Sequence, residues 1–451
     1  MDNLLPEKVT RYLEKKSFGK WVLEWNQSAG INNVVVIPVL CEFENIKNVL
    51  LSLAQNEKSA LKNSIIIFVV NNSASSDHKV KEDNKKSINF LRSIINHDSA
   101  NEFSQKVLTK GRMLGLIDAA SEGKELDDKL AGVGVARKIG MDTALQVFDF
   151  SIPDKKLIIS LDADCLVEEN YLSEISFFFR KENVSAATVE FEHNPSEDGI
   201  NRPGIISYEI FLRHYVAGLM LAKSPFAFHT VGSTIVCDHE AYIKVGGMNT
   251  KKAAEDFYFL QKLAKHYKIN RIGSTMVRPS ARESWRVPFG TGRSMSEIAS
   301  GKKDIMVYDP DVFIILKKWL EIFNSDLSTD TDLLLSEAQK IHPELSQFLE
   351  QRRFRQNWEK ILCNSKTAKQ INYQKNNLFD GFETLKLLHH LRNTAFPMMK
   401  LNAGVEKLFR ITAHSVKFDL ETKQNEMMRT YSFYLSELKL LENELYKRNY
   451  E

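Results

Sequence analysis

The sequence predicts an α/β fold, in which a mostly parallel sheet is flanked by helices and a mainly helical region follows. Residues 34–39 and 65–70 are continuous runs of β-branched and other apolar residues, typical of strands buried on both faces. Residues 44–55, between these runs, have apolar side chains at helical spacing. Strand, helix and strand in this order indicate parallel pairing through right-handed crossovers.

The chain divides into three predicted regions. Residues 1–30 carry aromatic and apolar residues at helical spacing and are predicted to form a helical lead-in to an α/β domain spanning 31–305. In residues 306–451 glycine is nearly absent, and helical segments rich in Leu, Glu, Gln and Lys dominate. Inside the α/β domain, residues 74–130 are polar and lysine-rich, which predicts a long connection with helical patches and no clear strand.

Composition excludes several classes of protein. With 451 residues, 43% hydrophobic and 26% charged, the chain is long enough for two domains and has an ordinary globular composition. Its net charge of +3 gives no bulk argument for binding nucleic acid. The four cysteines form no CxxC pair, which favours reduced thiols and a cytoplasmic protein. We find no secretory signal and no apolar run of roughly 18 residues, so any membrane contact is expected to be peripheral.

Two carboxylates, Asp162 and Asp164, follow the apolar run 157–161. Crowded carboxylates repel each other and take up protons unless a cation lies nearby. Mg²⁺ binds one or two carboxylates together with the phosphate oxygens of a substrate, and open α/β sheets bind ligands at the carboxyl ends of their strands. If the strand continues, both side chains face the same side. The pair predicts a site for Mn²⁺ or Mg²⁺ and a diphosphate; the alternative is that the acids cap a following helix.

Polar residues also follow the two apolar runs near the N-terminus. Pro38 and Glu42 come at the end of the first run, and Asn71 and Ser73 at the end of the second. They should reach the same sheet edge as Asp162 and could bind a base or ribose; the alternative is ordinary turn chemistry, which fits Ser73 better than Glu42.

Arg137 follows the glycine pair Gly132 and Gly134, which could bring backbone close to a diphosphate. The third glycine and the preceding strand of a dinucleotide fingerprint are missing, so that signal is weak. Arg137 is a candidate partner for phosphate, against the default of an arginine on a helix surface.

Glu255 and Asp256 open a helical stretch. Acids in a first turn are favoured by the helix dipole whatever the function. The functional interpretation is that Asp256 removes a proton from an acceptor hydroxyl.

An arginine-rich segment surrounds the sequence Pro-Phe-Gly-Thr-Gly at 288–292. Four arginines in a glycine-containing loop suit a multiply charged anion, although ordinary surface ion pairs are the alternative. The four are Arg278, Arg282, Arg286 and Arg293.

Taken together and in this order, the motifs resemble family 2 glycosyltransferases of the GT-A fold, which is a Rossmann-like α/β fold. The resemblance covers about residues 31–300 and also includes Gly232-Ser233-Thr234 and Val245-Gly246-Gly247-Met248. It implies a nucleotide-sugar donor, with Asp164 as the metal ligand, Asp162 beside it, and Asp256 with Glu255 as the catalytic acids. It also implies nucleotide-sugar binding by the four strand-end residues and by Arg137, Asp162, Gly232, Ser233, Arg282 and Arg286, with Asp162 also beside the metal.

The sequence departs from the family in several places. Asn71 and Asn72 stand where members commonly have an aspartate, and residues 74–130 are longer than usual. The Gln-x-x-Arg-Trp motif and membrane helices of processive synthases are absent, which favours transfer of one sugar at a time. Residues 306–451 could shape the acceptor site, dimerise or touch a membrane. A sugar-nucleotide nucleotidyltransferase and a non-catalytic nucleotide-sugar or partner-binding protein are the competing interpretations.

Overall fold

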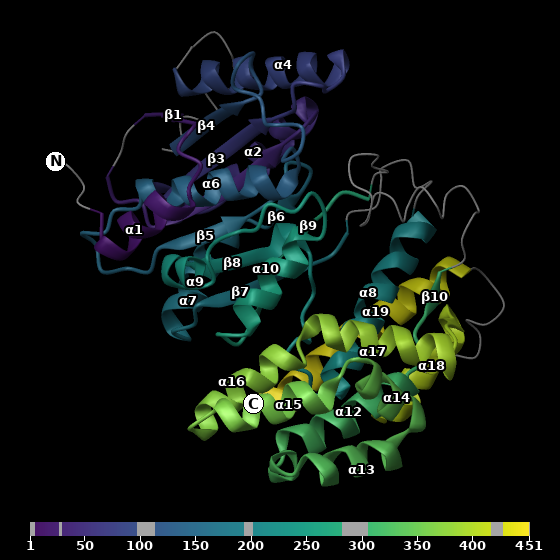
Figure 1. Cartoon of the computed structure of the whole chain (residues 1–451). Coiled ribbons are helices and arrows are strands. Elements are labelled where there is room, and N and C mark those ends of the chain that lie inside the picture. Colours follow the sequence, from purple (N-terminus) through teal and green to yellow (C-terminus); the bar gives the residue numbers. More distant parts are fainter. Residues whose placement is uncertain are drawn as a thin grey trace. The chain divides into compact units, whose positions relative to one another are not determined.

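The computed structural model describes residues 5–26, 29–96, 113–193, 202–281, 305–415 and 427–450 (Figure 1). The chain forms two compact units. The first comprises residues 1–194, 230–280 and 286–289, and the second comprises 195–229, 281–285 and 290–451. Thus α8 (Arg202–Leu221) belongs with the C-terminal helices, whereas the predicted boundary near residue 305 stays a prediction.

The first unit is built on a nine-stranded sheet in the order β1-β4-β3-β2-β5-β8-β7-β9-β6. The block β4-β3-β2-β5 is parallel, β7 pairs with β9 in parallel, and the other neighbours are antiparallel. The strands are β1 (Leu23–Trp25), β2 (Asn33–Val39), β3 (Ser64–Asn71), β4 (Met113–Ala119), β5 (Leu157–Ser160), β6 (Leu166–Val167), β7 (Ala186–Phe191), β8 (Ile235–Asp238) and β9 (Asn270–Arg278). The predicted fold class, a mostly parallel sheet flanked by helices with a helical region after it, is confirmed.

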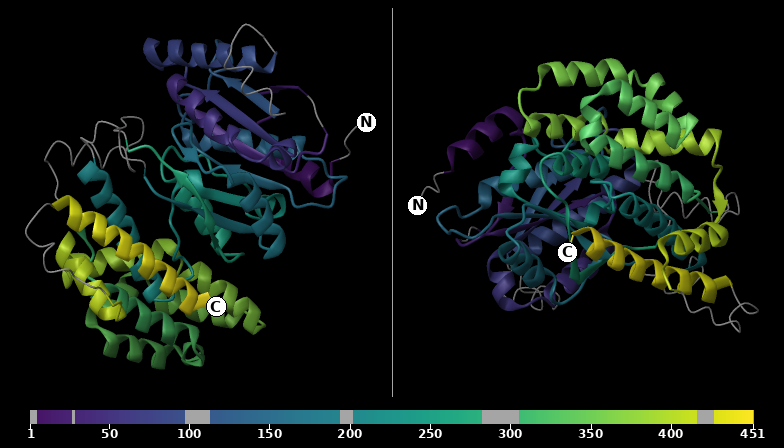
Figure 2. Two further views of the ribbon diagram at one scale, coloured as in Figure 1. Left: turned by 180° about the vertical axis from the view of Figure 1, so that it is seen from behind. Right: turned by 90° about the horizontal axis from the view of Figure 1, so that it is seen from below.

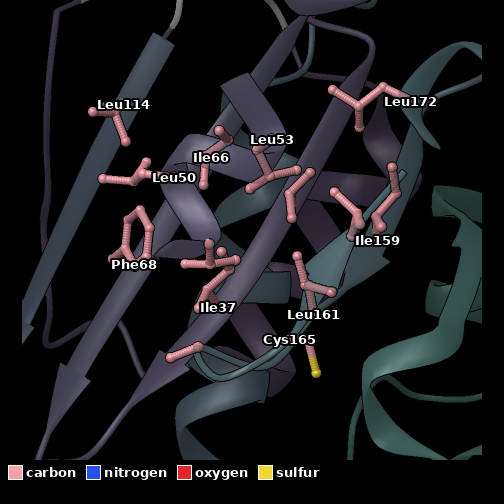
Figure 3. Close-up of a cluster of buried hydrophobic side chains, with 14 of the residues drawn as sticks. Ile37, Leu50, Leu53, Ile66, Phe68, Leu114, Ile159, Leu161, Cys165 and Leu172 are labelled. Atoms are coloured by element: carbon pink, nitrogen blue, oxygen red, sulfur yellow. The ribbon is translucent and has the colours of Figure 1, made fainter. Parts of the chain in front are cut away.

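Helices cover both faces of the parallel block. The helices of this unit are α1 (Glu7–Lys16), α2 (Phe43–Ala54), α3 (Lys58–Lys62), α4 (His78–Ile95), α6 (Val133–Val147), α7 (Tyr171–Lys181), α9 (His239–Lys244) and α10 (Glu255–Ala264), with a 3-10 turn at Gly232–Thr234. Alternate residues of β2 point to opposite faces. Ile37 packs with Leu50 and Leu53 of α2 on one face, which Figure 3 shows, while Val36 lies against α6 on the other.

Gly140 sets how closely α6 approaches the sheet. A Cβ at this position would come within 2.9 Å of the Val69 Cγ2 atom and closer still to Val36. We expect Gly140→Ala to lower the free energy of unfolding by about 1–3 kcal/mol through overpacking, less up to about 1 kcal/mol gained in helix propensity. Urea denaturation measures this change. Gly273→Ala is the control, because a Cβ at Gly273 meets nothing within 4 Å; equal losses in both variants would contradict the packing argument.

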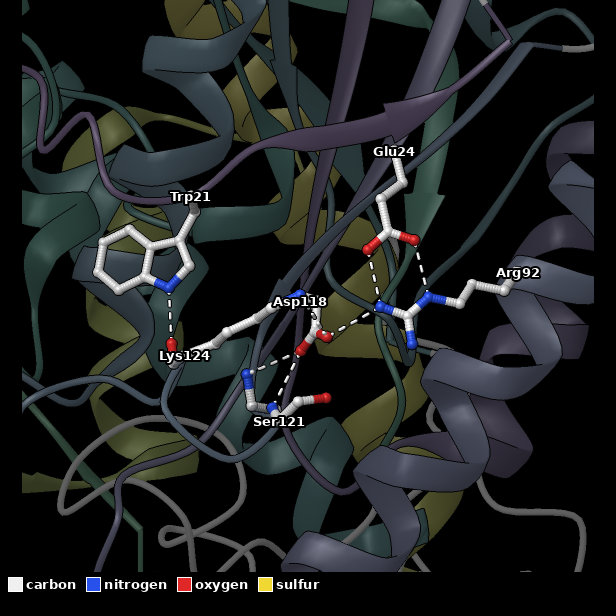
Figure 4. Close-up of polar contacts among 7 residues, drawn as sticks. Trp21, Glu24, Arg92, Asp118, Ser121 and Lys124 are labelled. Atoms are coloured by element: carbon white, nitrogen blue, oxygen red, sulfur yellow. Dashed lines mark hydrogen bonds and ion pairs between the residues drawn. The ribbon is translucent and has the colours of Figure 1, made fainter.

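Two strands lie where the sequence predicted none. β1 falls in the predicted helical lead-in, and β4 falls in the predicted strand-free connection 74–130. Arg92 of α4 links these two strands through ion pairs with Glu24 of β1 at 2.7 Å and with Asp118 of β4 at 2.9 Å (Figure 4). β4 contains Gly115, where a Cβ would lie 2.7 Å from the Leu23 Cδ1 atom. Gly115 weakens the sequence pattern that would predict a strand. Its missing side chain also leaves the space that Leu23 of β1 occupies.

A buried polar cluster ties α1 to α6. The Asp142 carboxylate accepts hydrogen bonds from the hydroxyls of Tyr12 at 2.9 Å and Tyr242 at 2.7 Å, and from Lys138 at 2.8 Å. Because α6 also carries Arg137, this cluster helps to fix the helix that reaches the candidate site.

The second unit is helical apart from one two-stranded pair of β10 (Met306–Val307) with β11 (Met399–Lys400), within its described residues. Its helices besides α8 are α12 (Asp311–Asn324), α13 (Thr331–Ile341), α14 (Pro343–Gln351), α15 (Phe354–Asn364), α16 (Ala368–Leu378), α17 (Gly381–Thr394), α18 (Leu401–Thr412) and α19 (Met427–Tyr450), with a 3-10 turn at Asp326–Thr329. α19, in yellow in Figure 2, packs along α8. None of the described helices has the length and apolar character needed to cross a membrane.

Candidate active site

The Asp162-Ala163-Asp164 segment forms a turn rather than the end of a strand. β5 ends at Ser160, and the backbone N–H of Cys165 donates to the carbonyl oxygen of Asp162 at 3.2 Å. Ala163 and Cys165 point into the core, whereas both aspartates are partly exposed. One ligand atom from each of Asp162, Asp164 and Cys165 lies within 4.8 Å of the others, so the turn achieves the clustering that a continued strand was expected to provide.

Hard oxygen ligands in this turn suit Mg²⁺ or Mn²⁺. Cys165 was not among the predicted site residues, and the available signal was its position next to Asp164. Burial, followed by the charges of Asp164 and Asp162, raises the pKa of the Cys165 thiol well above its usual value. Only the thiolate binds metals well, so the fit to a metal rests on the two carboxylates.

Arg137 joins the two acidic clusters of the sequence. It lies in α6, and only 3% of it is exposed. One terminal guanidinium nitrogen donates to Asp162 Oδ1 at 2.5 Å, and the other donates to Glu255 Oε1. The default expectation of an arginine on a helix surface is therefore wrong for this residue.

Glu255 and Asp256 form the first turn of α10. The preceding residue, Ala254, has a left-handed backbone with φ of 56°, which turns the chain sharply into the helix. Burial raises the pKa of Glu255 to about 7, and the charge of Arg137 opposes this rise. Loss of contact with water also raises the pKa of Asp256, and the charge of Arg137 again opposes this rise. Both groups therefore have a higher proton affinity than ordinary carboxylates.

Gly232 and Ser233 line the same site. A Cβ on Gly232 would lie 2.5–2.8 Å from the guanidinium atoms of Arg137, so this glycine lies directly against the cation. Ser233 is buried, and its hydroxyl interacts with the Cys165 thiol.

The other strand-end residues are engaged in local contacts. The Asn71 amide donates to the carbonyl oxygens of Val39 at 2.9 Å and Val69 at 3.2 Å. The buried Glu42 carboxylate accepts from the Asn45 amide at 2.5 Å. These bonds organise the loops at the carboxyl ends of β2 and β3.

Pro38 lies half-buried in β2, and the Ser73 hydroxyl contacts those of Ser75 and Ser76 at 3.1 and 3.2 Å. Direct ligand contacts by the four strand-end candidates, Pro38, Glu42, Asn71 and Ser73, stay predictions.

Part of the arginine-rich segment lies beyond the described structure. Arg282, Arg286 and Arg293 are outside the described residues. Arg278 ends β9 and forms an ion pair with Glu168 at 2.9 Å. Anion binding by this segment stays a prediction.

Several solved structures are similar to this chain. S. aureus TarS 1-349 in complex with UDP-GlcNAc has 12% identity and a TM-score of 0.35, covering 93% of this chain and 93% of TarS. The mannosyltransferase PcManGT from Pyrobaculum calidifontis, in complex with GDP-Man and Mn2+, has 13% identity and a TM-score of 0.36, covering 97% of this chain and 92% of its own. No family model matches the chain, and no curated protein matches it.

Proposed function

We propose that this chain is a metal-dependent inverting glycosyltransferase. It moves a single sugar from a nucleotide-diphosphate donor to a hydroxyl of a glycan, lipid-linked or small-molecule acceptor, in bacterial-type glycan or glycolipid synthesis as the sequence resemblance implies. The observation that carries the proposal is the contact of Arg137 with both Asp162 and Glu255. This contact supports placing the two acidic clusters, Asp162 with Asp164 and Glu255 with Asp256, in one site. The site lies near the carboxyl end of β5, where open α/β sheets bind ligands.

The proposed reaction is a single displacement. Asp256 accepts the proton of the acceptor hydroxyl, whose oxygen forms a bond to the anomeric carbon as the bond from that carbon to the diphosphate breaks. The leaving group is the nucleoside diphosphate, and the anomeric configuration inverts. A divalent metal held by Asp164 and Asp162 would neutralise charge that develops on the departing diphosphate.

Asp164→Asn tests the metal side of this proposal. We expect it to weaken Mn²⁺-dependent donor binding by roughly 10–100-fold, because the substitution removes a charged oxygen ligand. Isothermal titration with nucleotide sugars, beginning with UDP-GlcNAc and GDP-Man, measures the affinity with Mn²⁺ and with chelator. Wild-type binding that is indifferent to both chelator and Asp164→Asn would show that the metal assignment is wrong.

The products separate this function from its rivals. A glycosyltransferase releases a nucleoside diphosphate from a nucleotide sugar. When no acceptor is present, it transfers the sugar slowly to water and releases the same product. A nucleotidyltransferase instead consumes a sugar phosphate and a nucleoside triphosphate and releases pyrophosphate. A non-catalytic binding protein gives neither product.

Peripheral membrane contact and self-association through the C-terminal helices are also part of the proposal. Vesicle co-sedimentation tests the membrane contact, and light scattering tests the self-association.

A further inference from the structure

Two carboxylates pair with one buried cation in the candidate site, and a third lies beside them. Asp162 and Glu255 both pair with Arg137, and Asp256 adjoins Glu255. In the part of the chain that the structure describes, no second cation forms an ion pair with Asp162 or Glu255. The side chains of Arg137 and Glu255 are only 4% and 5% exposed, so water screens their charges weakly. The two carboxylates are therefore held where they are by the same guanidinium group.

Two glycines allow the close packing around Arg137 and Glu255. Gly232 leaves the space that the planar group fills, since a Cβ there would overlap it. Gly134, in the first turn of α6, lies against the loop before α10: a Cβ there would be 3.0 Å from the Asn249 carbonyl oxygen and 3.1 Å from the Glu255 Cβ. The first turn of α6 thus packs closely against the loop before α10 and the start of that helix, and Arg137 reaches from α6 to Glu255.

We infer that Arg137 is a positioning residue, which fixes the predicted metal-binding turn and the predicted catalytic acids relative to each other. The inference rests on the proposed function and deepens it. A guanidinium group presents several N–H donors in a rigid plane, so it can hold two carboxylates in a defined geometry. A lysine ammonium is a compact point charge that cannot reproduce this geometry.

Arg137 in this role acts through the carboxylates and not through the donor diphosphate. An arginine that bound the donor diphosphate equally well in the ground state and in the transition state would contribute to donor affinity and leave the transfer rate of the bound donor unchanged. A positioning arginine affects both, because Asp162 lies on the donor side and Glu255 on the acceptor side. Misplacement of reacting groups by about 1 Å costs on the order of 10²-fold in rate.

The experiment compares Arg137→Lys, Arg137→Ala and Gly232→Ala with wild type in two measurements. Donor affinity is measured by titration with Mn²⁺, and transfer of bound donor is measured in single turnovers. We expect the single-turnover rate to fall on the order of 10²-fold in all three variants. Gly232→Ala is informative because it keeps every charge, and the three atoms nearest to the added Cβ all belong to the guanidinium group. Gly273→Ala is the matched control and should retain the wild-type rate, since a Cβ there meets nothing within 4 Å.

Rescue separates positioning from a general loss of structure. Adding guanidinium ion at millimolar concentration to Arg137→Ala should restore part of the single-turnover rate, and ammonium ion should restore none. Single-turnover rates that stay at the wild-type value in Gly232→Ala and Arg137→Lys, with only donor affinity reduced, would overturn the inference. So would a lack of guanidinium rescue in a variant that circular dichroism shows to be folded.

A failure of the proposed function would look different. In that case wild type itself shows neither Mn²⁺-dependent donor binding nor release of nucleoside diphosphate. The ion pair between Arg137 and Glu255 can still be tested by a double-mutant cycle, in which the melting temperature is measured for Arg137→Met, Glu255→Gln and the double variant. We expect strongly non-additive losses in melting temperature, and additive losses would show that Arg137 and Glu255 are not coupled.

Discussion

Replacing Asp256 with asparagine should slow sugar transfer by orders of magnitude and leave donor binding in place. Asparagine has nearly the shape of aspartate but cannot accept a proton at neutral pH. A positioned general base contributes about 10²–10⁴-fold to a rate, so transfer should fall by that factor. Donor affinity should change only a few-fold, because the predicted metal ligands lie in a different turn. Single-turnover transfer and donor titration in the same preparation measure the two quantities.

The control for this prediction is Asp332→Asn. Asp332 occupies the second position of α13, as Asp256 does in α10, and its side chain is 86% exposed. Asp332 is an acid in the first turn of a helix, as Asp256 is, and removing its exposed charge costs about 0.3–1 kcal/mol of stability. We expect Asp332→Asn to retain full transfer. Full transfer by Asp256→Asn would assign the proton acceptor to another residue.

The parallel block of the sheet could be predicted from sequence because its strands are buried on both faces. β2 and β3 have no polar face, so their β-branched runs stand out against every neighbouring segment. β1 and β4 could not be predicted in the same way. β1 has three partly buried residues, and β4 contains Gly115, whose role depends on Leu23 from a distant part of the chain.

The acidic residues of the candidate site could be predicted from the sequence, whereas the contacts that join them could not. The acids at Asp162, Asp164, Glu255 and Asp256 have a local signature, because charges follow an apolar strand or begin a helix. The burial of Arg137 has none, since the sequence around it is compatible with an exposed helix face. Its environment depends on Gly232 and on the turn after β5, and these are brought together only by the sheet order. Sequence patterns therefore identified the carboxylates, whereas the cation that joins them required the tertiary structure.

Glu442→Ala is expected to destabilise the second unit by about 3–5 kcal/mol. Glu442 lies in α19 and is fully buried. Its carboxylate accepts a hydrogen bond from Arg213 of α8 at 2.8 Å and lies 2.8 Å from the His229 imidazole. Arg213 also pairs with Glu209 at 2.9 Å. Removing Glu442 leaves Arg213 paired with Glu209 and takes away the carboxylate beside His229, and breaking a buried charge network in this way is costly.

Glu444→Ala is the matched control, because Glu444 lies on the same helix but its side chain is 45% exposed. Its ion pairs with His414 at 3.2 Å and Arg448 at 3.6 Å are partly in water, and exposed pairs contribute about 0–1 kcal/mol. Hydrogen exchange of the α8 and α19 backbone measures both variants in the second unit itself. Protection should collapse in Glu442→Ala and persist in Glu444→Ala. Equal losses in the two variants would mean that α19 is held by its apolar contacts and that the buried charges contribute little to its docking on α8.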